Sequence, residues 1–113
     1  MHEWGYCEGI LAAVQKRAAG RRVKRVRLRA GMLHRLDHAA LQQAFSLAAR
    51  GSEAEGAVVD LICTPVRWRC RVCGGESEAA DIVVFCPGCG GMDVEVSGGG
   101  EIILESVEYE TAR

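Results

Sequence analysis

Four cysteines carry the clearest chemistry in this sequence of 113 residues. They form two Cys-x2-Cys pairs, Cys70 with Cys73 and Cys86 with Cys89, separated by twelve residues. Each pair can place two thiolates on one tight turn, and two such turns supply four ligands to a tetrahedral ion at about 2.3 Å. Because four protein ligands leave no open coordination position, the spacing predicts a structural zinc site.

Two other interpretations of the cysteine quartet stay open at this point. The thiolates also suit a mononuclear iron centre, because ligand softness and tetrahedral geometry do not separate zinc from iron. The low aromatic content, two each of Trp, Tyr and Phe, argues against the apolar wrapping of a redox centre. Disulfides or unrelated thiols are the other interpretation. Gly74 and Gly90 after the two pairs favour a metal, because glycine at positive φ can turn backbone N–H groups toward sulfur.

The N-terminus offers a second metal site of a different kind. The α-amine of Met1, the deprotonated amide nitrogen of His2 and the His2 imidazole can form fused chelate rings in one plane. Three nitrogens in a plane suit Ni(II) or Cu(II), and the fourth position stays open for exchange with a partner protein. A histidine at position 2 is also compatible with a frayed tail that has no function.

Two helices and three strands are predicted to position these sites. Residues 3–19 are predicted as a helix, with an apolar face made of Trp4, Cys7, Leu11, Val14 and Ala18. A half-buried strand follows at 21–30, then a helix at 36–50 that Asp37 caps, then a strand at 57–64. A strand, a helix and a strand in this order predict a parallel crossover.

The last strand is predicted at residues 101–110 and is expected to lie beside 21–30. Its inward side chains are expected to be Ile103, Val107 and Tyr109, and its glutamates 105, 108 and 110 are expected to oppose Arg25, Arg27 and Arg29. A short strand is also expected at 82–85. The predicted domains are 1–64 together with 99–113, which hold the nickel site, and 65–98, which form the zinc module.

The charge distribution favours pairing within the chain. Residues 1–50 hold ten Lys/Arg and three Asp/Glu, a balance of +7, whereas residues 51–113 hold four and twelve, a balance of −8. Neither a membrane span nor a signal peptide is visible, so we expect a cytoplasmic protein with reduced thiols. Cys7 and Cys63 are then expected to be small buried residues. His34 and His38 are four apart, but His34 precedes the predicted helix, which disfavours a shared metal.

Three motifs together resemble a known family. The chain starts Met1-His2-Glu3, carries the segment RGSEAEG from Arg50 to Gly56, and then the cysteine quartet. In this order they resemble the HypA/HybF family, the nickel metallochaperones of hydrogenase maturation, over nearly the whole chain. The resemblance implies an α+β fold with a small mixed three-stranded sheet, two helices and an inserted four-cysteine module of zinc-ribbon type.

The resemblance also implies roles for individual residues. Met1, through its amine, and His2 would bind nickel, Glu3 would influence that site or a partner contact, and the four cysteines would hold structural zinc. The implied partners are a HypB-type GTPase and the large subunit of [NiFe]-hydrogenase, with urease maturation factors as further candidates. The implied role is that of a carrier and not an enzyme. No histidine stands beside the zinc cysteines, and His38 occupies a place where members often have proline.

The main alternative is a zinc-ribbon module that binds nucleic acid. Arg67, Arg69 and Arg71 flank Trp68, an arrangement that can contact phosphates and stack on a base. The acidity of this half of the chain argues against it, so neither nucleic acid nor a membrane is an expected partner. A redox protein with iron at the four cysteines is the third interpretation.

Overall fold

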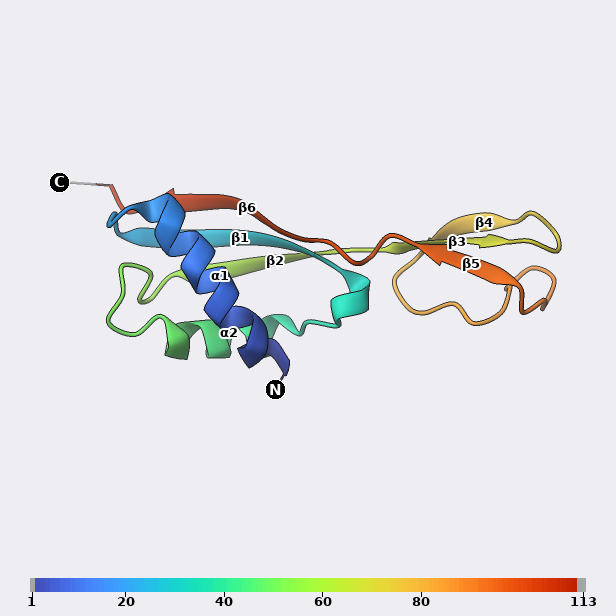
Figure 1. Cartoon of the computed structure of the whole chain (residues 1–113), viewed down its shortest axis with the longest axis horizontal. Helices are drawn as coiled ribbons and strands as arrows, with labels where there is room; N and C mark the ends of the chain where they lie inside the picture. Colours follow the sequence, from blue (N-terminus) through green and yellow to red (C-terminus); the bar gives the residue numbers. More distant parts are fainter. Residues whose placement is uncertain (1, 112–113) are drawn as a thin grey trace. The chain divides into compact units, whose positions relative to one another are not determined.

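The computed structural model describes residues 2–111 and divides into two compact units (Figure 1). The first unit runs through Arg29, then Leu36–Ile62, and from Ile102 onward; the second comprises Ala30–Arg35 and Cys63–Glu101. The elements in chain order are α1 His2–Ala18, β1 Val23–Gly31, the 3-10 turn η1 Met32–His34, α2 His38–Ala48, β2 Val58–Thr64, β3 Val66–Cys70, β4 Glu76–Ala79, β5 Val94–Ser97 and β6 Ile102–Tyr109. Two helices and two three-stranded sheets confirm the predicted α+β class.

The sheet of the first unit has the order β2-β1-β6. β2 runs parallel to β1 and β6 runs antiparallel to it, so the sheet is mixed (Figure 1). The connection from β1 through α2 to β2 is therefore the predicted parallel crossover. One buried core joins both helices to the sheet; among its members are Val14 and Ile10 of α1, Val26 and Leu28 of β1, and Leu41 and Phe45 of α2.

The buried face of α1 differs from the predicted one. Trp4 is 44% exposed, and the buried stripe begins instead at Glu3, continuing through Cys7, Ile10, Val14 and Ala18. The spacing of three and four residues is the predicted one, but the face is displaced by one position at its start. A carboxylate can occupy the first buried position because a backbone N–H donates to it, which offsets part of the cost of removing the charge from water.

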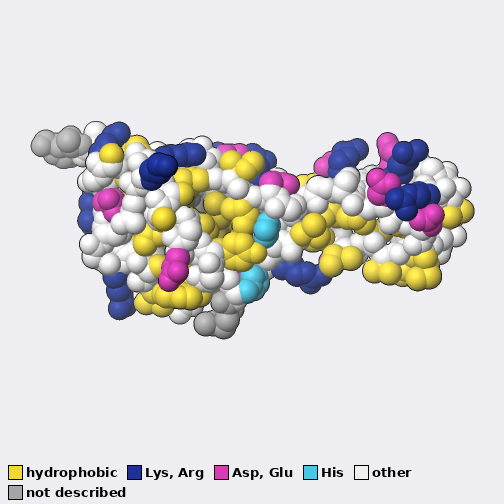
Figure 2. All heavy atoms as spheres, viewed as in Figure 1, with side chains coloured by type: hydrophobic (Ala, Val, Ile, Leu, Met, Phe, Trp, Pro, Cys, Tyr) yellow, Lys and Arg dark blue, Asp and Glu magenta, His cyan; other side chains and the backbone are white. Residues whose placement is uncertain are grey.

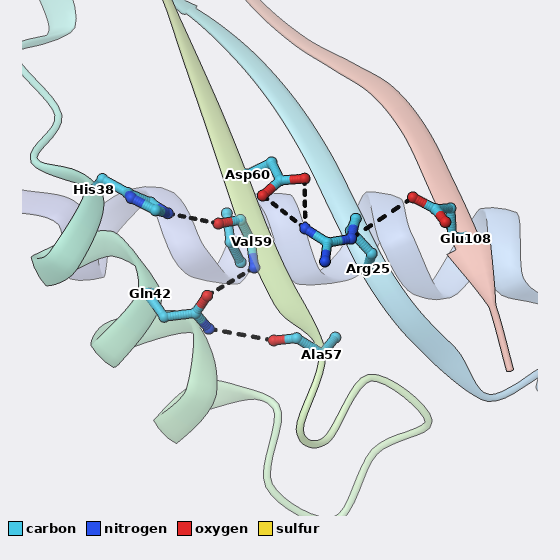
Figure 3. Close-up of polar contacts among 7 residues, drawn as sticks. All are labelled: Arg25, His38, Gln42, Ala57, Val59, Asp60 and Glu108. Carbon is cyan, nitrogen blue, oxygen red and sulfur yellow. Dashed lines mark hydrogen bonds and ion pairs between the residues drawn. The ribbon is translucent and has the colours of Figure 1, made fainter.

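Arg25 and Arg29 of β1 pair with glutamates of β6 as predicted, and Arg25 also pairs with Asp60 of β2. The Arg25 guanidinium donates to both oxygens of Asp60 at 2.8 and 2.7 Å and lies 3.7 Å from Glu108 (Figure 3). Arg29 pairs with Glu105, and Arg22 lies 3.7 Å from Glu110. The hydrogen bond that Arg25 donates to Asp60 raises the pKa of Arg25 above its ordinary value. The pairs extend across all three strands of the sheet.

The side chains of β6 do not alternate as predicted. Ile103 is 47% exposed, whereas Leu104 packs against the core together with Val107 and Tyr109. Leu104 and Val107 both pack against the core although they are three residues apart. The alternation of inward and outward side chains therefore shifts by one residue within β6, whereas the prediction assumed that every second side chain points inward.

Side chains of α2 cover the outer edge of β2 (Figure 3). Gln42 accepts from the Val59 N–H at 2.7 Å and donates to the Ala57 carbonyl at 3.2 Å. The Nε2 of His38 lies 2.7 Å from the Val59 carbonyl oxygen. Since β2 is an edge strand, these contacts satisfy backbone groups that would otherwise invite pairing with another chain.

Reversing three charges on and directly after β6 is expected to lower the melting temperature of the first unit by roughly 5 °C or more. The triple change Glu105→Lys, Glu108→Lys and Glu110→Lys replaces the attraction of these residues to Arg29, Arg25 and Arg22 with repulsion. Thermal unfolding in low salt measures the effect. The control is Glu8→Lys on an exposed position of α1; equal melting of the triple variant and this control would contradict the pairing.

The second unit contains a sheet of order β4-β3-β5, in which β3 pairs antiparallel with both neighbours. The strand predicted at 82–85 is not present: Ile82, Val84 and Phe85 lie in an irregular, exposed segment. Both edges of β3 are already taken, by Glu76–Ala79 on one side and Val94–Ser97 on the other. The apolar composition of residues 82–85 therefore led to the wrong segment being predicted as a strand.

The two cysteines outside the quartet differ in exposure. Cys63 in the second unit is exposed, so the expectation of a buried thiol is wrong there, whereas Cys7 in the first unit is fully buried as expected.

In the second unit, Gly31 packs directly on the backbone of Gly99. A Cβ at position 31 would lie 2.0 Å from the Gly99 carbonyl oxygen. A hydrogen bond of 2.7 Å from the Gly31 N–H to the Glu101 carbonyl accompanies this approach.

Candidate metal sites

The four cysteines of the quartet come together in the second unit. Cys70 ends β3, Cys73 lies on the turn that follows, and Cys86 and Cys89 lie on the turn that precedes β5. Their sulfur atoms all lie within 4.8 Å of one another, and the Cys70–Cys89 and Cys73–Cys86 pairs are 3.6 Å apart. A tetrahedron with Zn–S bonds of about 2.3 Å has edges of about 3.8 Å, so the cluster fits a zinc ion.

The two cysteine turns have the same backbone design. The Gly74 N–H donates to the Cys70 carbonyl at 2.9 Å, and the Gly90 N–H donates to the Cys86 carbonyl at 2.8 Å. Both glycines have positive φ, 78° and 76°, as the sequence predicts. This conformation is accessible to glycine at little steric cost, which explains its place after each pair.

Hydrogen bonds and burial separate the thiol pKa values within the quartet. The Cys73 N–H lowers the pKa of Cys70, and the N–H groups of Cys89 and Gly88 lower the pKa of Cys86 to about 7. The Gly91 N–H acts in the same direction on Cys89, but the Cys70 thiol and burial outweigh it and raise the pKa of Cys89 to about 11. Because a metal binds thiolates, its binding must release protons at neutral pH.

The candidate nickel site begins at His2, the first residue of α1; Met1 lies outside the described residues. The His2 side chain is 51% exposed, and its Nδ1 lies 3.7 Å from Glu3 Oε1. Its ring meets that of Tyr6 edge-on, with centroids 6.1 Å apart. The imidazole is therefore accessible to solvent while one of its nitrogens faces a carboxylate.

Glu3 links the starts of the two helices. Its Oε2 accepts a hydrogen bond of 2.9 Å from the Asp37 N–H, and the residue is only 4% exposed. Asp37 in turn caps α2, since its side chain accepts from the Ala40 N–H at 2.9 Å as predicted. The Asp37 N–H lowers the pKa of Glu3 from 4.5 to about 2. Sequence reasoning missed this partner because any residue except proline carries a backbone N–H.

The Glu3 carboxylate is expected to titrate near pH 2. Since the folded-state pKa is lowered, the carboxylate stabilises the fold above about pH 4.5 and this contribution is lost as the pH falls from 4.5 toward 2. An NMR titration of the Glu3 side chain measures the midpoint directly. A Glu3→Gln variant is expected to melt with less dependence on pH in this window. Glu8→Gln on an exposed position of α1 is the control, and a Glu3 midpoint near 4.5 would contradict the assignment.

The other histidines contact backbone carbonyls. His34 Nε2 lies 2.8 Å from the Gly100 oxygen in the second unit, and His38 contacts Val59 in the first. Within residues 2–111, the quartet is the only group of three or more His, Cys, Asp or Glu side chains that converges at metal-binding distance.

The arginines considered for nucleic acid binding face carboxylates. Arg71 donates to Asp93 and Glu95, each at 2.9 Å. Arg67 stands opposite Glu78 in the sheet register, and Arg69 stands opposite Glu76 and Glu95. Figure 2 shows Lys/Arg and Asp/Glu side chains intermixed over the second unit. The arrangement does not form the uninterrupted basic stripe that a phosphate backbone requires.

Comparisons with known proteins cover nearly the whole length of the chain. A family model described as "Hydrogenase/urease nickel incorporation, metallochaperone, hypA" matches residues 1–109. The hydrogenase maturation factor HypA of Rhodobacter capsulatus is 40% identical over 111 residues, covering 96% of this chain and 98% of the relative. HypA of Desulfitobacterium hafniense is 34% identical over 113 residues, covering 97% and 99%.

Solved structures show the same fold. The solution structure of the Ni metallochaperone HypA from Helicobacter pylori has a TM-score of 0.60 at 20% identity and covers 95% of this chain and 96% of that one. A second HypA solution structure has a TM-score of 0.63 at 22% identity, covering 97% of each chain. In the part of the chain that the structure describes, neither helix has the length and apolar character needed to cross a membrane.

Proposed function

Because the chain belongs to the HypA family of metallochaperones for nickel incorporation, we propose that it binds Ni(II) at its own N-terminus and delivers the ion to [NiFe]-hydrogenase. The ligands are the Met1 amine, the His2 amide nitrogen and the His2 imidazole, in the plane that Ni(II) prefers. The observation that carries this proposal is the accessible His2 imidazole beside a Glu3 carboxylate fixed to the start of α2.

The start of α1 suits such a site chemically. An amide in the first turn of a helix takes no part in the helix's own hydrogen-bond ladder, so its deprotonation removes no ladder bond. Glu3, ionised at neutral pH, supplies negative charge beside His2 and favours a cation there. Its hydrogen bond to the Asp37 N–H holds that charge in place. In this proposal Glu3 supports the site from outside the three-nitrogen plane.

Zinc has a structural role in this proposal. The quartet offers four thiolates and no open position, so it holds the second unit together without carrying the nickel cargo. We assign residues 65–98 to the zinc module and residues 1–64 with 99–113 to the nickel-binding domain. A cytoplasmic location accords with the need for four reduced thiols.

A shallow apolar groove beside Glu3 supports exchange of nickel with partner proteins. It is lined by Glu3, Trp4, Ala40, Gln43, Ala44 and Leu47. Trp4 and Leu47 are each 44% exposed, which leaves apolar surface next to the proposed nickel ligands. We propose that the nickel-exchange partners, a HypB-type GTPase and the hydrogenase large subunit, approach this side, and that urease maturation is a second destination. The protein carries out no catalytic turnover in this role.

Blocking the Met1 amine is expected to abolish tight nickel binding. Acetylation or an N-terminal extension removes one of three nitrogens and one chelate ring, while the zinc and the fold stay unchanged. The measurement is nickel stoichiometry by equilibrium dialysis, with zinc content and circular dichroism recorded on the same samples. A protein carrying the same extension at its C-terminus is the matched control. Unchanged nickel affinity in the blocked protein would exclude the amine as a ligand.

A further inference from the structure

We propose that Cys73 is the exchangeable ligand of the quartet, the sulfur with which soft electrophiles and peroxides react first. The inference rests on the proposed zinc site and concerns how that site opens. Two differences among the four cysteines support it. The sulfurs differ in whether a backbone N–H donates to them, and the residues differ in their exposure to solvent.

Backbone N–H groups donate to three of the four sulfurs. The Cys73 N–H lies 3.5 Å from Cys70 Sγ, the Gly88 N–H lies 3.3 Å from Cys86 Sγ, and the Gly91 N–H lies 3.4 Å from Cys89 Sγ. Across residues 2–111 no backbone N–H donates to Cys73 Sγ, which lies 3.6 Å from the Cys86 sulfur. An N–H donor draws charge from a thiolate and lowers its nucleophilicity, so the Cys73 sulfur keeps the most electron density.

The chain continues differently after the two turns. Gly91 follows Cys89 by two residues, as Gly75 follows Cys73, and both lie close to the preceding sulfur. Gly75, however, leads directly into β4, whose pairing with β3 begins at Glu76 opposite Arg69. The carbonyls of Gly75 and Gly91 accept matching hydrogen bonds from the N–H groups of Cys70 and Cys86, at 2.8 and 2.7 Å, but only the Gly91 N–H donates to the preceding cysteine sulfur.

The exposure of the four cysteines also indicates Cys73 as the most reactive ligand. Cys70 and Cys86 are 0% and 1% exposed, whereas Cys73 and Cys89 are both exposed. Cys89 has the Gly91 N–H, so Cys73 alone combines an exposed position with a sulfur that lacks a backbone donor. A reagent from solvent therefore meets its most nucleophilic target at Cys73.

The chemistry at Cys73 follows from its nucleophilic sulfur. With a maleimide, Sγ forms a C–S bond to one alkene carbon and the neighbouring carbon takes a proton from water, leaving a thioether that is a weaker ligand than a thiolate. With a peroxide, Sγ attacks oxygen, the O–O bond breaks, and hydroxide or alkoxide leaves, giving a sulfenic acid. The Cys86 thiolate, 3.6 Å away, then displaces hydroxide and forms a Cys73–Cys86 disulfide. The peroxide is reduced and the two sulfurs are oxidised.

Pulsed alkylation of the full-length, zinc-loaded protein tests the order of reaction. The protein is exposed to N-ethylmaleimide for short intervals, quenched, digested, and analysed by mass spectrometry for each cysteine, while a dye records released zinc. Cys73 is expected to react about fivefold faster than Cys89, the factor that corresponds to one hydrogen bond of typical net strength. Cys63, which is exposed and outside the quartet, and Cys7, which is buried, serve as internal references. Labelling of Cys89 as fast as Cys73 would overturn the proposal.

Peroxide treatment of the zinc-loaded protein gives a second test. The fast phase of zinc release is expected to coincide with oxidation of Cys73 and to precede oxidation of Cys89, and oxidation of Cys89 in step with the first zinc released would contradict the proposal. Peptide mapping after limited peroxide treatment is expected to find Cys73 joined to Cys86, and a first disulfide without Cys73 would contradict the proposal. Zinc is counted beforehand. A chain purified without zinc would refute the metal assignment itself, whereas bound zinc with uniform labelling would refute only the role of Cys73.

Discussion

Replacing Cys86 with alanine is expected to release the zinc and unfold the sheet of β3, β4 and β5. The apolar residues buried in the second unit are few, Ala30, Val66, Cys70 and Cys86, and two of these are proposed metal ligands. Structural zinc contributes about 10–16 kcal/mol in small zinc domains. So small an apolar core does not replace a contribution of that size, and loss of one ligand should remove the order of the whole sheet.

Metal analysis and amide dispersion in NMR spectra measure this effect. The amides of β3 are expected to collapse to random-coil shifts in Cys86→Ala, while those of α1 and β1 stay dispersed. The first unit keeps its order because its core consists of its own residues, from Cys7 to Val59. Cys63→Ala, at an exposed cysteine outside the quartet, is the matched control and should retain one zinc. Dispersed β3 amides in a zinc-free Cys86→Ala protein would show that the metal does not organise the module.

Replacing His2 with alanine is expected to weaken nickel binding at least about a hundredfold, the equivalent of about 2.8 kcal/mol. The change removes the imidazole and one chelate ring, and leaves two nitrogens that hold the ion far less well. Competition with a chelator of known affinity measures the loss, and the absorption bands of planar Ni(II) report the geometry. Zinc content and the helical signal should not change, because the exposed His2 side chain is not among the residues that form the core.

The other two histidines provide controls for this prediction. The Nε2 atoms of His34 and His38 contact carbonyl oxygens of the backbone, so neither residue is part of the proposed nickel site. His34→Ala and His38→Ala should therefore bind nickel as the natural protein does. Loss of nickel binding in His38→Ala but not in His2→Ala would place the site at the start of α2 and refute the N-terminal assignment.

The features predicted well from the sequence are those set by local spacing. Each Cys-x2-Cys pair and the glycine after it form a turn whose geometry depends only on those few residues. The four sulfurs converge as expected. Asp37 caps α2 because capping depends on neighbours three residues away. The complementary charges of the two halves also predicted the pairing of β1 arginines with β6 glutamates, since charge balance acts over any sequence distance.

The features that were missed depend on contacts between distant segments. The spacing of apolar residues in α1 predicts that every third or fourth side chain is buried, but it does not say at which residue the buried face begins. That face begins at Glu3 and not at Trp4 because Glu3 accepts a hydrogen bond from the Asp37 N–H. The segment at 82–85 is apolar enough for a strand, yet the more polar Glu76–Ala79 pairs with β3 because it follows the first cysteine turn directly. Propensity for a strand is overridden here by the position that the turn imposes.

The most direct test of the central claim is a calorimetric titration of Ni(II) into untagged, zinc-loaded protein that keeps its native Met1. The account predicts one nickel ion bound per chain in addition to the resident zinc, with protons released as the amide and amine give up theirs. Failure to bind nickel under these conditions, or uptake of nickel only by displacement of the zinc, would contradict an N-terminal nickel carrier.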